Sequence, residues 1–212
     1  MQVLTEDDVR QRLDTDRVIA AIESAFRDRY LSTDIPVRPD LQMVGGIFQT
    51  MPCYDRTGHA LGMKLVVVQE NPRRPEDRIQ ATYMLLDPES GRPLVIVPAN
   101  YFTDLRTAAT SAVATRFLAR EPVRVLGVFG TGRQARAHIK VLPRVRRFEQ
   151  VLVCGRDAGA SREFAQKMSA ETNNFENWCF CINRSMDNWS AWKCDGHSSP
   201  LCQYCCNTCT IA

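Results

Sequence analysis

The 212-residue sequence predicts a mixed α/β fold made of two successive domains. Helical and then strand-like apolar periods fill the first 119 residues in the order of an α+β domain. An apolar run of strand length at 123–129 then leads through paired glycines into a helical stretch and a second apolar run at 151–153. This strand–turn–helix–strand order is typical of a βαβ unit with parallel strands.

Two helices are expected near the N-terminus. Thr5 can cap the first one, because Asp8 follows three residues later in a box-like arrangement. Asp14 or Thr15 begins the second. Its apolar residues recur at helical spacing on one face, at Val18, Ile22, Ala25, Phe26 and Tyr30.

Four strand-like runs follow, at residues 43–51, 60–69, 79–87 and 93–98. A loop rich in proline and charge occupies 71–77, and the turn sequence Asp87-Pro88-Glu89-Ser90-Gly91 precedes the last run. Runs of this length separated by short turns predict an antiparallel meander.

A helix should connect the meander to the second domain. Thr103 or Asp104 is placed to cap it, and Glu121-Pro122 marks the boundary after its end near Ala119. Alanines in its apolar stripe indicate a closely packed neighbour; the stripe contains Leu105, Ala108, Ala109, Ala112, Val113 and Phe117. Residues 1–119 form the predicted α+β substrate domain.

The segment Gly130-Thr131-Gly132-Arg133-Gln134-Ala135 follows the first strand of the second domain. Gly130 suits a tight turn, Gly132 lets backbone amides approach a pyrophosphate, and the small Ala135 lets the helix lie against the strand. The helix N-terminus adds partial positive charge. Residues 120–173 are therefore predicted to be the first part of a Rossmann NAD(P)-binding domain, with these six residues at the cofactor.

Arg156 lies at the end of the second strand, 21 positions beyond Ala135. A Rossmann unit places here the residue that contacts the ribose 2′ position, where an acid suits NAD and an arginine suits NADP. The sequence thus predicts NAD or NADP and favours NADP. Asp157 beside Arg156 keeps NAD open, as does the alternative that Arg156 is a solvated surface residue.

The composition argues against several classes of partner. The formal net charge is +3 and Lys and Arg are scattered among acids, so no nucleic-acid surface is expected. No apolar run reaches membrane-spanning length, and acids near the N-terminus are unlike a signal peptide. We therefore expect a cytoplasmic protein with no nucleic-acid or membrane partner.

Four polar side chains of the first domain are candidates for chemistry. Arg38, fixed between prolines, can clamp a carboxylate, and Lys64 stands in an apolar strand where burial favours proton exchange. Thr82 lies on the next strand, and Arg106 lies in the first turn of the connecting helix. Each alone is more simply a surface side chain. Together, beside a dinucleotide turn, they predict a nicotinamide enzyme acting on an amino, imino or oxo acid.

Several segments carry a family resemblance. Met51-Pro52, Gly62-Met63-Lys64 and Asp87 to Leu94 are followed by Leu105-Arg106-Thr107-Ala108-Ala109 and then by the Gly130 turn. The pair Arg-Thr-Ala-Ala and Gly-x-Gly-x-Gln-Ala at this spacing is a specific signature. In these segments residues 1–172 resemble the ornithine cyclodeaminase/mu-crystallin family.

The resemblance implies an N-terminal dimerisation and substrate domain followed by a Rossmann domain, in a homodimer. It implies that Arg38 and Arg106 hold the substrate carboxylate and that Lys64 is the catalytic group that transfers a proton or polarises the substrate. Thr82 would hydrogen-bond the substrate, and Thr107 would lie near the cofactor phosphates. The implied function is an NAD(P)-dependent cyclodeaminase or cyclic-imine reductase acting on a small α-amino or α-imino acid. The alternative is a non-catalytic, mu-crystallin-like NAD(P)-binding protein.

Residues 174–212 depart from the family pattern, because they lack a regular period and hold seven of the nine cysteines. We expect them to be poorly ordered and to supply neither further strands nor the catalytic aspartate of the family. An out-of-frame or alternatively spliced end would explain this and would leave the Rossmann domain incomplete and the chain inactive. A zinc site at Cys202, Cys205, Cys206 and Cys209, or a disulfide staple, are the other interpretations. We assign no metal site.

Overall fold

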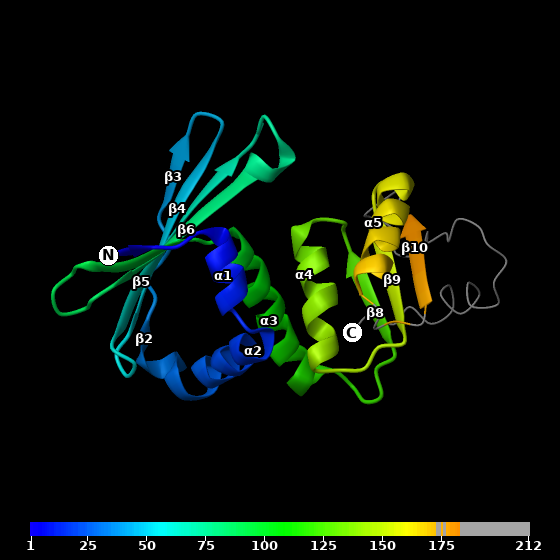
Figure 1. The fold of residues 1–212 in the computed structure, drawn as a ribbon, viewed down its shortest axis with the longest axis horizontal. Helices are drawn as coiled ribbons and strands as arrows, with labels where there is room; N and C mark the ends of the chain where they lie inside the picture. The colour runs from blue at the N-terminus through cyan, green and yellow to red at the C-terminus, as the bar shows by residue number, and fades with distance from the viewer. Residues whose placement is uncertain (173–174, 176, 183–212) are drawn as a thin grey trace. The chain divides into compact units, whose positions relative to one another are not determined.

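The computed structural model describes residues 1–172, 175 and 177–182. These residues form two compact units that divide between Thr107 and Ala108. Figure 1 shows that each unit contains a sheet with helices beside it. The mixed α/β class is thereby confirmed. The sequence predicted a boundary after residue 119, whereas the two units divide within the helix that precedes that position.

The first unit is built on a seven-stranded sheet in the order β1-β7-β6-β5-β4-β2, with β3 also paired to β4. The strands are β1 Gln2–Val3, β2 Thr33–Asp34, β3 Asp40–Met43, β4 Gly46–Asp55, β5 Ala60–Gln69, β6 Ile79–Leu86 and β7 Pro93–Pro98. Strands β4 to β7 are antiparallel neighbours and confirm the meander. Strand β1 adds to β7 in parallel.

The strand predicted at 43–51 is wrong in its extent. The chain reverses after Met43, so that β3 and β4 pair with each other across a two-residue turn at Val44 and Gly45. Gly45 has φ of 77°, a left-handed conformation that glycine adopts at little cost. The Val44-Gly45 turn was the overlooked signal.

The first two helices begin where the sequence predicts. Helix α1, Glu6–Arg12, has a capping box in which the Thr5 hydroxyl accepts from Asp8 N–H and Asp8 accepts from Thr5 N–H. Helix α2, Thr15–Ser24, is capped by Asp14. A π-helical turn, Ala25–Arg29, follows α2. Its wider turn breaks the 3.6-residue spacing, so the predicted apolar stripe fails at its end and Phe26 and Tyr30 are exposed.

Helix α3, Asn100–Leu118, starts earlier than the predicted cap at Thr103 or Asp104. The Asn100 side chain accepts from the Ala81 N–H of β6 and donates to Gln80, which fixes the first turn. Thr103 therefore lies inside the helix, where its N–H donates to Ala99 O. Most of the predicted stripe is buried, but Phe117 is exposed.

The second unit contains three parallel strands in the order β10-β9-β8. Its elements are β8 Val125–Phe129, α4 Arg133–Val141, β9 Gln150–Gly155, α5 Ala158–Glu171 and β10 Asn177–Ile182. The expectation that the sequence after Asn174 adds no strand is wrong, because β10 pairs along its whole length with β9. The predicted cysteine pairs at 202–209 lie outside the described residues.

Helices α4 and α5 pack on this small sheet. Their core contains Val128, Ile139, Val151, Val153, Phe164, Ala165 and Met168, with Ala135 packed against it. Asp157 caps α5 by accepting from Ala160 N–H.

In the part of the chain whose structure is described, no helix is both long enough and apolar enough to cross a membrane.

Candidate functional site

Three cationic side chains of the first unit influence one another. Lys64 lies in the middle of β5, directly between Met51 of β4 and Tyr83 of β6. Arg106 is half-buried in the first part of α3, and Arg38 is exposed in the segment that links β2 to β3. The sheet and the start of α3 thus bring Lys64 and Arg106 into one electrostatic environment that also includes Arg38.

The charges of this cluster all act on Lys64 in the same direction. Burial lowers the pKa of Lys64 from 10.5 to about 8, and the positive charges of Arg106 and Arg38 add to the effect. Burial, together with Arg38, also lowers the pKa of Arg106. A bound carboxylate would offset this repulsion, and two guanidinium groups offer the geometry to bind one.

A lysine with a pKa near 8 can exchange a proton close to physiological pH. Its apolar surroundings come from the sheet face on which it stands. Val66 and Ala81 are buried on that face, and Ala99, just before α3, and Phe102, in the first turn of α3, pack with them. The arrangement can therefore hold an anionic substrate beside an amine that gives or takes a proton.

The sheet does not bring Thr82 into this cluster. Tyr83 is the direct cross-strand partner of Lys64, and Thr82 pairs with Leu65. Since neighbouring residues of a strand point to opposite faces, the exposed Thr82 lies on the face away from Lys64. Met51 and Tyr83, which flank Lys64, were not predicted as site residues. The strand register would have identified them, but the sequence alone does not supply it.

Thr107 belongs to the same helix as Arg106. Its hydroxyl donates to the carbonyl oxygen of Thr103 at 2.6 Å, so the side chain is bonded within its own helix. The Thr103 hydroxyl is buried and has no hydrogen-bond partner in the part of the chain that is described. Thr103 lies three residues before Arg106 and was not predicted as a site residue.

The predicted cofactor turn lies in the second unit, between β8 and α4. Gly130 has φ of 100°, and its N–H donates to Cys154 O at 2.6 Å, which ties the turn to β9. Gly132 is the N-cap of α4. A β-carbon built on either glycine would meet no described atom within 4 Å. The turn therefore has the open approach that a pyrophosphate needs.

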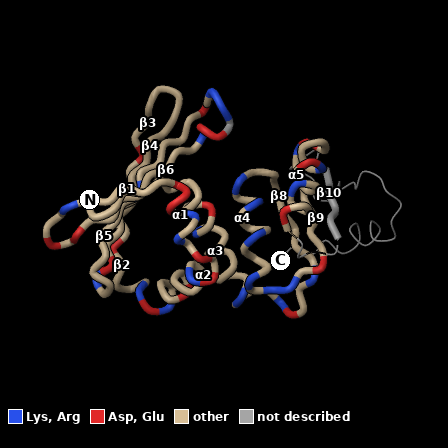
Figure 2. The backbone as a smooth tube through the Cα atoms, viewed as in Figure 1, with Lys and Arg blue, Asp and Glu red and all other residues tan. Residues whose placement is uncertain are grey.

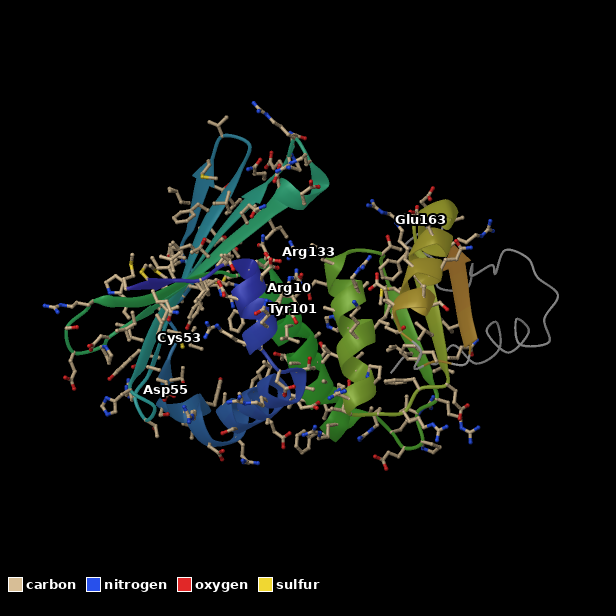
Figure 3. All side chains as sticks on the ribbon, in the orientation of Figure 1. Arg10, Cys53, Asp55, Tyr101, Arg133 and Glu163 are labelled. Carbon is tan, nitrogen blue, oxygen red and sulfur yellow. The ribbon has the colours of Figure 1, made fainter. Side chains whose placement is uncertain are left out.

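The other predicted cofactor residues surround this turn. Thr131 is half-buried, whereas Arg133 and Gln134 are exposed in the first turn of α4. Figure 2 shows basic positions along α4, and Figure 3 shows Arg133 at its start. Arg156 is exposed directly after β9. The residues present thus fit a dinucleotide, because a glycine turn at a helix N-terminus and exposed arginines are groups that bind phosphates.

The described residues contain no group of three or more His, Cys, Asp or Glu side chains arranged to bind a metal ion. Among the described residues, Cys53 and Cys154 form no disulfide. The pKa of the Cys53 thiol is raised by burial and by the carboxylates of Asp55 and Asp34. A raised pKa makes this thiol a weak nucleophile near neutral pH.

Solved structures with the same architecture carry nicotinamide cofactors. The delta(1)-pyrroline-2-carboxylate reductase of Thermococcus litoralis, in complex with NADH and L-proline, superposes with a TM-score of 0.77. It is 28% identical in sequence, and the match covers 87% of this chain and 58% of that one. An archaeal alanine dehydrogenase, a dimer with bound NAD, gives a TM-score of 0.74 at 28% identity over 84% of this chain and 55% of its own.

A curated relative supports the same relationship. The delta(1)-pyrroline-2-carboxylate reductase of Bacillus cereus is 32% identical over 170 residues, which cover 78% of this chain and 52% of the relative. The chain therefore spans about half the length of the relatives it matches. The Rossmann-like character of the second unit is confirmed by these neighbours.

The family model agrees with the motifs on which the sequence resemblance rests. The model of the ornithine cyclodeaminase/mu-crystallin family matches residues 1–177, which include the cation cluster, the glycine turn and Arg156. The match ends at the first residue of β10. With this match and the fold in agreement, the chain belongs to the ornithine cyclodeaminase/mu-crystallin family.

Proposed function

We propose that this chain provides the substrate clamp and the phosphate turn of an NAD(P)-dependent oxidoreductase that acts on a small α-imino or α-amino acid. The observation that carries the proposal is the cluster of Arg38, Lys64 and Arg106, in which a half-buried amine stands beside two carboxylate-binding groups. Similarity to reductases of pyrroline-2-carboxylate supports reduction of a cyclic imine. Ornithine cyclodeamination, the reaction in the family name, would require the same groups.

Each residue has a defined task in the proposed reaction. Arg38 and Arg106 bind the carboxylate and so orient the carbon next to it. The nicotinamide, when bound, supplies a hydride to that carbon or accepts one from it. Lys64 gives a proton to the nitrogen as the carbon–nitrogen double bond is reduced, and takes one in the reverse direction. Cyclodeamination requires both directions in turn, whereas an imine reductase needs only the first.

We further propose NADP(H) as the preferred cofactor. Arg156 directly follows β9, at the position where a Rossmann unit contacts the ribose 2′ substituent, and it is exposed. A guanidinium there can pair with a 2′-phosphate through two charged hydrogen bonds. Arg133 at the start of α4 adds positive charge near the phosphates.

We also propose a homodimer, by analogy with the dimeric archaeal alanine dehydrogenase. The sheet face opposite Lys64 is rich in half-buried apolar side chains: Phe48, Met63, Leu65, Val67 and Met84. Figure 1 shows α1, α2 and α3 together on one side of this sheet. A second copy of the chain, packed through the same face, would bury these apolar side chains, which lie on the side of the sheet without the three helices.

A cytoplasmic location fits a reaction that draws on the pyridine-nucleotide pool.

The activity itself is tested with the 212-residue chain and delta(1)-pyrroline-2-carboxylate. Loss of NADPH absorbance that depends on the imino acid is expected, because the clamp and the proton donor are both present. Lys64→Met should abolish it. Cofactor binding without turnover on any amino or imino acid would favour the non-catalytic binding protein, and absence of binding would overturn the proposal.

The cofactor preference is tested by Arg156→Ala. Loss of a charged hydrogen-bond partner costs roughly 1.5–3 kcal/mol, so NADPH affinity should fall about tenfold or more while NADH affinity is unchanged. Fluorescence titration with each nucleotide measures this. Arg162→Ala on the exposed face of α5 is the control. An equal loss of affinity for NADPH and NADH would contradict the proposed contact with the 2′-phosphate.

The lowered pKa of Lys64 predicts the direction in which the free energy of unfolding changes with pH. The folded-state pKa of about 8 lies below the ordinary 10.5, so the unfolded chain binds more protons between these values. The free energy of unfolding should therefore rise as pH increases from about 8 to 10.5. Lys64→Met should remove this rise, whereas Lys167→Met should keep it. Urea unfolding across the pH range measures the effect, and a flat wild-type profile would contradict it.

The dimer interface is tested by Leu65→Glu, which places a carboxylate on the apolar face and leaves the Lys64 face unchanged. Burying an unpaired charge is costly, so the dimer dissociation constant should rise roughly tenfold or more. Sedimentation velocity measures it. Val44→Glu, at the exposed β3–β4 turn, is the control. Unchanged assembly of a folded Leu65→Glu variant would place the interface elsewhere.

A further inference from the structure

Gly62 leaves a space that the tip of Tyr83 fills. Gly62 is buried on β5, two residues before Lys64 and therefore on the same face of the sheet. A β-carbon at Gly62 would collide with the Tyr83 hydroxyl and would lie 2.8 Å from the ring carbon that bears it. The Tyr83 ring thus reaches diagonally from β6 over a position with no side chain, within the range that aromatic residues span between strands.

The same ring also contacts helix α3. The centroids of Tyr83 and Phe102 are 5.8 Å apart, and the two rings are inclined at 59°. This tilted arrangement is a favourable one for aromatic pairs. Phe102 precedes Arg106 by four residues, so the two side chains lie one turn apart on one side of the helix. Tyr83 therefore connects the strand pair that carries Lys64 to the turn of α3 that directly precedes Arg106.

Tyr83 is also the direct neighbour of Lys64 across the strands. The cluster of Val66, Ala81 and Ala99 lies beside it, with Phe102 packed on that cluster. Burial is the largest cause of the lowered pKa of Lys64, and Tyr83 is one of the two side chains directly flanking it. For Tyr83 the direction is opposite: burial and the proximity of Cys53 raise its pKa. The Tyr83 hydroxyl therefore stays neutral at physiological pH.

We propose that Tyr83 is a positioning residue of the substrate site: held over Gly62 and packed on Phe102, it sets the placement of Arg106 relative to Lys64. This inference rests on the proposed function, in which Arg106 binds the carboxylate and Lys64 exchanges the proton. In the substrate, one carbon–carbon bond and one carbon–nitrogen bond separate the carboxylate carbon that Arg106 would hold from the nitrogen that Lys64 would protonate. A shift of α3 against β5 would therefore separate the clamp from the proton donor.

The test uses three variants that displace the Tyr83 ring, remove it or remove only its hydroxyl. Gly62→Ala forces Tyr83 out of its space, Tyr83→Leu removes both ring contacts, and Tyr83→Phe keeps the ring on Phe102. The double variant Gly62→Ala/Tyr83→Leu should resemble Tyr83→Leu alone, because the space is already vacated. Gly127→Ala in β8 is the matched control, since its β-carbon would meet only a Phe129 ring carbon at an ordinary 3.9 Å.

The first readout is the titration of Lys64, which needs neither turnover nor cofactor. The chain has four lysines, so NMR of isotopically labelled lysine resolves them, and Lys64→Met assigns the signal. Gly62→Ala and Tyr83→Leu should open Lys64 to water and raise its pKa by on the order of one unit. Tyr83→Phe and Gly127→Ala should leave the titration unchanged. A Lys64 pKa that stays near 8 in folded Tyr83→Leu would overturn the inference.

The second readout is the kinetic split. In an active chain, Gly62→Ala and Tyr83→Leu should raise KM for the imino acid roughly tenfold and leave the dissociation constant of NADPH unchanged. A general loss of stability would not raise KM for the imino acid while leaving the dissociation constant of NADPH unchanged. If the wild-type chain shows no turnover, the proposed function fails, and the Lys64 titration still decides whether Tyr83 positions the site.

Discussion

Mutual repulsion among Lys64, Arg38 and Arg106 is the constraint that the first unit must satisfy. Like charges in a half-buried setting raise the free energy of the folded state, so the apolar framework around them has to hold them together. That framework is the central part of the meander with the first turn of α3 packed on it. The Asn100 side chain, bonded to Ala81 N–H, fixes where the helix begins and therefore where Arg106 stands. A ligand carboxylate would relieve the repulsion, so the unfavourable arrangement of the free protein would favour binding of an anion.

The second unit differs from the first, because backbone groups of a glycine turn dominate its predicted cofactor site. Gly130 adopts a conformation that most residues avoid, and its hydrogen bond to Cys154 O holds the turn at the ends of two parallel strands. Gly132 is the N-cap of α4 and, having no side chain, makes no side-chain cap hydrogen bond. The buried cluster around Ile139 and Met168 keeps α4 and α5 fixed behind that turn. Rigidity in the core thus supports an open surface at the turn.

Local sequence signals predicted the elements whose causes are local. The capping box at Thr5, strands β5 and β7, and the glycine turn each depend on residues within a few positions of one another. Thr82 was misplaced relative to Lys64 because strand register depends on pairing between segments. Strand β10 was missed because an unusual composition hid a segment that needs β9 beside it to be recognised. The early start of α3 depends on Asn100 reaching another strand, which no pattern within the helix reveals.

The lowered pKa of Lys64 also changes the chemical reactivity of the chain. An amine is nucleophilic only when it is neutral. At pH 7 a group with a pKa of about 8 is neutral about a tenth of the time, against about 0.03% for an ordinary lysine at 10.5. Acylating metabolites and aldehydes would therefore meet several hundred times more reactive amine at Lys64 than at a lysine with the ordinary value. In the proposed reaction the low pKa suits this residue to proton transfer, and the same feature favours covalent modification of its amine, from which a bound substrate would protect it.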